Sequence, residues 1–178
     1  MPGGSFTADI TEIRERARQK MEEGPVTGSY GKDPKDVIAV LNEVLATEIV
    51  CWMRYTRHAI SATGINRAQV AAEFTEHAES ERGHAMLAAE RISQLGGEPD
   101  FDPATIAERA HTTYETFADG DLEGMLRDNL TAERIVITTY QEIIRWIGDD
   151  DPTTRRLLES ILADEEEHAD DLVDLLGA

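Results

Sequence analysis

The chain has 178 residues, and its 17 basic and 36 acidic side chains give a formal net charge of −19. That length suits one domain with a substantial core, while the charge disfavours DNA as a partner and favours cations. The single cysteine excludes an internal disulfide, and no signal peptide or long apolar span is recognisable, so we expect a cytoplasmic protein without membrane association.

Residues 1–33 are predicted to form an extension in front of a main domain that spans residues 34–178. A polar start leads into an amphipathic helical stretch over residues 8–23, which Gly24 and Pro25 end. Basic side chains alternate with glutamates in this stretch, which is typical of a solvated or docking helix rather than of a nucleic-acid-binding arm.

Four long helices are predicted in the main domain, because apolar residues recur there at helical spacing and no strand pattern competes. Each helix follows a capping residue, and these predicted caps are Asp33, Asn66, Asp121 and Asp151. The helices are expected to end at Gly64, at Leu95, at Gly148 and close to the end of the chain. Residues 96–120 are long enough to cross the length of a bundle, with a short helix expected at 104–118. The predicted fold is therefore all-α, an antiparallel four-helix bundle with a long crossover.

The two predicted helical hairpins resemble each other in sequence. The stretch LNEVLATEIVCWMRY at 41–55 aligns with LRDNLTAERIVITTY at 126–140, and a Glu-x-x-His segment follows each of them. The alignment pairs Glu48 with Glu133, Tyr55 with Tyr140, and Glu81 and His84 with Glu165 and His168.

Six of these side chains are expected to meet at one height in the bundle. Counted from the turn of each hairpin, the single glutamates and the Glu-x-x-His segments lie equally far along their helices, at about 1.5 Å per residue. The i, i+3 spacing places each motif's carboxylate and imidazole on one helical face. One glutamate from each of two helices and Glu-x-x-His from each of the others is the ligand set of di-iron bundles. The predicted ligands are Glu48, Glu81, His84, Glu133, Glu165 and His168.

The charge of such a cluster explains why cations are needed. Four ionised carboxylates in an apolar interior repel one another, so several should be protonated when no metal is bound. Two Fe(II) ions cancel that charge, and the imidazoles leave open positions for dioxygen or peroxide. Manganese or zinc could occupy the same ligands, because affinity order alone does not choose among these metals.

Residue type alone does not define the site. Glu108 and His111 also have Glu-x-x-His spacing, but they fall in the crossover without a partner at matching height, so we expect them on the surface. Tyr55 lies two turns from Glu48 on the same face and either relays an electron or proton or packs with a buried hydroxyl. His77 is expected to be a buried histidine near the site rather than a ligand.

Over about residues 37–176, the sequence resembles the bacterioferritins. The resemblance is carried by Glu48 with Tyr55, ESERGHA at 79–85, Glu133, and DEEEHADDL at 164–172. It implies bridging roles for Glu81 and Glu165, terminal roles for Glu48 and Glu133, and one nitrogen ligand per iron from His84 and His168. It also implies a ferroxidase that uses O2 or H2O2 at two iron ions per subunit, within a hollow iron-storing oligomer.

Two departures from the bacterioferritin pattern change the expected assembly. Arg82 stands where the haem-ligating methionine is found, which argues against haem. The chain ends ten residues after His168, too soon for the fifth helix that lines the four-fold axes of 24-subunit ferritins. Together with the crossover helix, this resembles Dps-like subunits, so a ferritin-like dodecamer is favoured over a 24-mer. Ordinary Dps proteins hold iron between subunits, whereas this predicted site is complete within one chain.

Two other functions compete with iron oxidation and storage. One is a Dps-type cage that shields DNA by binding it, which the net charge disfavours. The other is a di-metal redox enzyme that acts on peroxide or a small organic molecule without storing iron.

Overall fold

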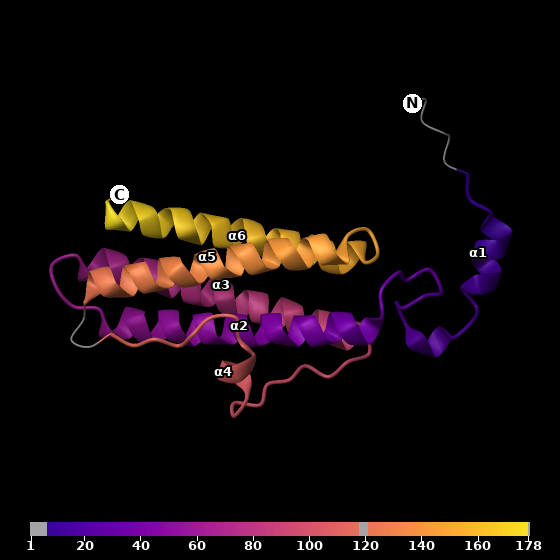
Figure 1. Cartoon of the computed structure of the whole chain (residues 1–178), viewed down its shortest axis with the longest axis horizontal. Helices are drawn as coiled ribbons and strands as arrows, with labels where there is room; N and C mark the ends of the chain where they lie inside the picture. Colours follow the sequence, from indigo (N-terminus) through magenta and orange to yellow (C-terminus); the bar gives the residue numbers. More distant parts are fainter. Residues whose placement is uncertain (1–6, 118–120, 178) are drawn as a thin grey trace.

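Four long helices, which carry most of the chain, pack into a bundle in the computed structural model, which describes residues 7–117 and 121–177 (Figure 1). They are α2 (Pro34–Ser61), α3 (Arg67–Gln94), α5 (Leu122–Ile147) and α6 (Pro152–Leu176). Helices α2 and α3 form one antiparallel hairpin, α5 and α6 form the other, and the described residues contain no strand. The all-α four-helix prediction is confirmed.

The starts of the long helices follow the predicted caps. Side chains of Asp33, Asp121 and Asp151 each accept a hydrogen bond at 2.9 to 3.0 Å from a backbone N–H in the first turn of the following helix. These bonds satisfy N–H groups that have no partner within the helix. Asn66 occupies the N-cap position of α3 but makes no capping side-chain hydrogen bond, so its predicted capping role is wrong although the helix begins there.

The buried apolar side chains form two clusters along the bundle. The cluster nearer the α5–α6 turn includes Leu41, Leu45, Ile92, Leu158 and Ile161. The cluster nearer the α2–α3 turn includes Tyr55, Phe74, Met125 and Leu172. The buried glutamates of the four helices lie between the two clusters, so they are held in a poorly solvated environment by apolar packing on both sides.

The crossover is less helical than predicted. Residue 118 of the predicted helix at 104–118 lies outside the described residues. Between 104 and 117, only α4 (Ile106–Arg109) is helical, and the chain then runs along α2 without regular structure (Figure 1). The buried guanidinium of Arg54 donates to the carbonyl of Thr113 at 2.9 Å and to the side-chain oxygen of Asn129 at 2.9 Å. The N–H of His111 likewise donates to Thr47 Oγ1 at 2.9 Å, so side chains of α2 replace helical hydrogen bonds at these two positions.

The helix predicted at 8–23 in the extension is also shorter in the structure. Helix α1 (Ile10–Arg16) is followed by a separate 3-10 turn, Met21–Glu23, and Lys20 between them has a left-handed backbone with φ 51°. Helix α1 contains no buried residue and stands away from the bundle (Figure 1). A helix of this length gains little from its own backbone bonds without packing.

The end of the extension contacts the bundle directly. The hydroxyl of Tyr30 donates to the carboxylate of Asp151 at 2.6 Å, and the N–H of Gly31 donates to the carbonyl of Asp150 at 3.2 Å. These bonds tie the extension to the α5–α6 turn. A division of the chain at residue 33 therefore stays a prediction. Within the described ranges, no helix has both the length and the apolar character needed to cross a membrane.

Candidate metal centre

The structure brings the six predicted ligands together in the polar middle of the bundle. Helices α2 and α5 each contribute one glutamate, and α3 and α6 each contribute one Glu-x-x-His motif. All six residues are at most 6% exposed; they are Glu48, Glu81, His84, Glu133, Glu165 and His168. Equal spacing from the turns, with a fixed rise per residue, is what places these side chains at one height.

Two overlapping sets of metal-binding atoms can be drawn among these residues. One set contains Glu48, Glu81, His84 and Glu165, and the other contains Glu81, Glu133, Glu165 and His168. Within each set the available ligand atoms lie within 4.8 Å of one another. Because Glu81 and Glu165 belong to both sets, the arrangement suits two neighbouring cations bridged by these two carboxylates.

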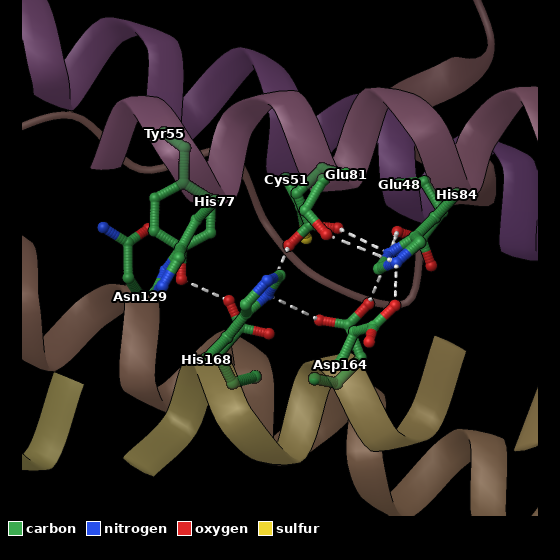
Figure 2. A network of polar contacts seen from close by, with 12 residues as sticks. Glu48, Cys51, Tyr55, His77, Glu81, His84, Asn129, Asp164 and His168 are labelled. Atoms are coloured by element: carbon green, nitrogen blue, oxygen red, sulfur yellow. Dashed lines mark hydrogen bonds and ion pairs between the residues drawn. The ribbon is translucent and has the colours of Figure 1, made fainter. Parts of the chain in front are cut away.

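Both imidazoles direct Nδ1 toward the carboxylates (Figure 2). Nδ1 of His84 lies 3.1 Å from Glu165 Oε1 and 3.5 Å from Glu48 Oε2. Nδ1 of His168 lies 3.3 Å from Glu165 Oε2 and 3.6 Å from Glu81 Oε1. When the proton of a neutral ring resides on Nε2, Nδ1 has a free lone pair for a cation at this position.

Burial and mutual repulsion change how the cluster holds protons. Burial, followed by repulsion from Glu81, raises the pKa of Glu48 to about 8. Burial alone would lower the pKa of His168, but the neighbouring carboxylates of Glu165 and Glu81 outweigh that effect and raise the pKa to about 11. The pKa of His84 is raised for the same reasons. The metal-free cluster therefore carries protons near neutral pH, and bound cations would displace them.

Several buried polar atoms of the cluster have no hydrogen-bond partner. A buried polar group left unsatisfied is costly, and native proteins contain few of them. These atoms are Glu48 Oε2, both carboxylate oxygens of Glu81, Glu133 Oε2, Glu165 Oε2 and His168 Nδ1. All of them belong to the two donor sets, so the residues present fit a pair of divalent cations.

Two tyrosines connect the hairpins through the single glutamates. The Tyr55 hydroxyl of α2 donates to Glu133 of α5, and the Tyr140 hydroxyl of α5 donates to Glu48 of α2. Burial, followed by the charge of the neighbouring carboxylate, raises the pKa of both phenols, so both remain donors at neutral pH. Of the two roles predicted for Tyr55, the structure shows a buried hydroxyl on a candidate ligand, and a relay role stays a prediction.

Sequence reasoning missed Asp164. Its Oδ2 lies 3.0 Å from Nε2 of His84, the ring nitrogen other than the one that faces the glutamates (Figure 2). Ser80 Oγ lies 3.4 Å from the same nitrogen. A carboxylate that accepts the proton of one ring nitrogen orients the other nitrogen toward a metal and raises its basicity. The only sequence signal was an aspartate beside Glu165, which is weak in so acidic a chain.

Replacing Asp164 with alanine is expected to weaken Zn²⁺ binding at the centre about tenfold, because His84 loses the acceptor that orients it. Competition with a chromophoric chelator measures this affinity. Asp170→Ala is the matched control, because Asp170 is an exposed aspartate of the same helix. Equal affinities for the two variants would contradict the orienting role.

Glu108 and His111 do not join the cluster. Glu108 is exposed, as predicted, and His111 is partly buried, with Nε2 3.4 Å from Glu43 Oε2 and its ring edge-on to Tyr140. The position of a motif along the bundle, and not its residue types, therefore decides whether a Glu-x-x-His motif joins the cluster.

Comparison with known proteins relates the chain to one family. A family model for the ferritin-like domain matches residues 38–178. Bacterioferritin of Mycobacterium avium is 30% identical over 152 residues, which cover 82% of this chain and 89% of that protein. The DNA protection during starvation protein of Pyrococcus furiosus is 31% identical over 140 residues, which cover 78% and 75% respectively.

Solved structures show the same relation. A dodecameric thioferritin, the bacterioferritin-related protein from Bacteroides fragilis, superposes with a TM-score of 0.79 at 40% identity and covers 83% of this chain and 88% of its own. Dps from Thermosynechococcus elongatus superposes with a TM-score of 0.76 over 80% of this chain and 90% of its own. At 20% identity, the second similarity concerns the fold alone.

Proposed function

Since the chain belongs to the ferritin-like domain family, we propose that it is a ferroxidase that oxidises Fe(II) and stores the ferric product. Its proposed iron ligands are Glu48, Glu81, His84, Glu133, Glu165 and His168. The observation that carries the proposal is the pair of overlapping donor sets that share Glu81 and Glu165. Two adjacent cations suit the two-electron reduction of dioxygen or peroxide, because each Fe(II) supplies one electron.

The reaction balances with either oxidant. With dioxygen, two Fe(II) and two protons give two Fe(III) and one H2O2. With peroxide, two Fe(II), one H2O2 and two protons give two Fe(III) and two waters. The buried carboxylates supply the negative charge that favours Fe(III) over Fe(II). The hydroxyls of Tyr55 and Tyr140 hold Glu133 and Glu48 in place while the charge of the ions changes.

Storage requires a hollow assembly, and self-association into a cage is supported by the assemblies of similar proteins. The thioferritin that is 40% identical is described as dodecameric, and we propose twelve subunits in preference to twenty-four. No role for haem is proposed, because the residue after Glu81 is the exposed Arg82, which forms an ion pair with Glu79 at 2.9 Å.

Rapid mixing of metal-free protein with Fe(II) in the presence of oxidant tests the proposal. Oxidation is expected to be much faster than in buffer and to saturate near two irons per chain. Light scattering should give a mass near twelve chains. Oxidation no faster than the buffer blank would overturn ferroxidase activity, and a monomer or dimer would overturn storage in a cage.

DNA protection is the second candidate, because one relative at 31% identity is named for it. Helix α1 projects from the bundle with Arg14 and Arg16 in its last turn and has no buried residue, so it offers basic side chains to a polyanion. A gel-shift assay at low salt with the full chain, and with a chain lacking residues 1–33, tests this function. No retardation of either chain excludes DNA binding, and retardation that depends on the extension supports it.

A further inference from the structure

A third group of metal-binding side chains lies next to the proposed iron centre. Glu73 and His77 of α3 and Asp171 of α6 offer ligand atoms that all lie within 4.8 Å of one another. The two carboxylate side chains are partly open to solvent, with exposed fractions of 29% for Glu73 and 43% for Asp171, whereas His77 is 2% exposed. The group therefore extends from the surface into the bundle.

The buried imidazole of His77 has no hydrogen-bond partner for either ring nitrogen among the described residues. Nε2 lies 3.3 Å from Glu73 Oε1 and 3.5 Å from Asp171 Oδ2, so two acceptor oxygens converge on one nitrogen. A buried polar group without hydrogen bonds is costly. A cation between one nitrogen and two carboxylate oxygens would satisfy all three groups at once.

The position of His77 connects this group to the iron ligands. Its ring stacks on the ring of His168, with centroids 4.1 Å apart and an interplanar angle of 23°. Figure 2 shows His77 beside His168, on the side of the cluster where Tyr55 lies. A cation held by His77 would therefore lie next to a ligand of the buried centre, between that centre and the partly exposed carboxylates.

We propose that Glu73, His77 and Asp171 bind a divalent first-row metal ion, and that Fe(II) passes through this site into the di-iron centre. One imidazole and two carboxylates suit such ions, and the partial exposure leaves positions for water, so the ion can leave again. Two negative charges on a partly exposed surface attract cations from solution. The binding site stands on its own geometry, whereas the transfer of Fe(II) rests on the proposed function.

Metal counting tests the binding site without any oxidation. Full-length metal-free protein, dialysed against Co(II), is expected to bind three ions per chain. The double variant Glu73→Gln with Asp171→Asn should bind two. The matched control, Glu76→Gln with Asp170→Asn, changes exposed carboxylates of the same two helices by the same charge and should still bind three. Two ions in the wild type, or equal counts in the variant and its control, would overturn the site.

Fe(II) oxidation at limiting iron tests the transfer. The double variant should still saturate near two irons per chain, but its initial rate should fall about tenfold below that of the control. Equal rates would overturn the transfer step. If the wild type binds three Co(II) but fails to oxidise Fe(II), the proposed ferroxidase function is wrong and the third site stands. The two failures are thus distinguishable.

Discussion

Replacing Glu81 with glutamine is expected to slow Fe(II) oxidation at least about 100-fold. Glu81 belongs to both donor sets, and both of its carboxylate oxygens lack a hydrogen-bond partner in the protein. The amide removes one negative charge and replaces one acceptor oxygen by a donor, so both cation positions are affected. Stopped-flow absorbance after mixing with Fe(II) measures the rate.

Glu79→Gln provides the matched control for this substitution. Glu79 lies on the same helix, and its side chain is 63% exposed, so the same change of charge should leave the oxidation rate within about twofold of the wild type. Glu165→Gln should slow Fe(II) oxidation as much as Glu81→Gln does. The double variant should be only slightly slower than either single variant, because the effects of residues that act as one unit are not additive. Full activity in Glu81→Gln would contradict a bridging role.

The convergence of the six side chains could be predicted because it depends only on helix geometry. A fixed rise per residue converts the number of residues from a turn into height, and two short turns make the hairpins antiparallel. The prediction for Glu48 and Glu81 therefore needed no knowledge of side-chain packing. The same count excluded Glu108 and His111, which match in residue type alone.

The crossover could not be predicted in the same way. Residues 104–118 have a composition compatible with a helix, but α4 ends at Arg109. Beyond it, the hydroxyl oxygen of Thr47 accepts from the N–H of His111 at 2.9 Å. The carbonyl of Thr113 accepts from Arg54, a residue 59 positions earlier in the chain. Such a long-range hydrogen bond overrides local preference and leaves no periodic signal in the sequence.

Contacts around the histidines depend on how the helices are rotated against each other. Asp164 reaches His84, and Asp171 reaches His77, only because α3 and α6 face each other at that height. The spacing of residues along α3 does not determine which aspartate of α6 will contact a given histidine ring. The candidate ligands could therefore be identified from the sequence, whereas the aspartates that contact the rings of His84 and His77 required the structure.

Raising the pH from 7.5 to 9 is expected to lower the melting temperature of the metal-free protein. The pKa of Glu48 is about 8 in the folded protein, above its ordinary 4.5, so the folded state holds a proton that the unfolded state has lost. Stability from a raised pKa is lost as the pH rises through the folded value. His168, whose pKa is raised to about 11 from 6.5, acts in the same direction.

Other buried groups do not reverse this trend. Burial lowers the pKa of both His58 and His77 to about 4, so above pH 7.5 these rings are neutral in the folded and in the unfolded protein alike. Burial raises the pKa of Cys51, so the folded chain also keeps this proton longer as the pH rises. Scanning calorimetry at several pH values in this range measures the slope.

Loading the protein with Zn²⁺ is expected to remove most of that slope. Bound cations displace the protons of Glu48 and His168, and because protons compete with the metal, its affinity rises with pH. A ligand that binds only the folded state stabilises it in proportion to the logarithm of that affinity, so this gain offsets the stability that the metal-free protein loses, and the melting temperature should stay nearly constant from pH 7.5 to 8.5. Glu48→Gln should make the slope of the metal-free protein less steep, because one titrating group is absent while His168 remains. Parallel slopes with and without Zn²⁺ would mean that the cations do not replace these protons, and the two-cation assignment would then be wrong.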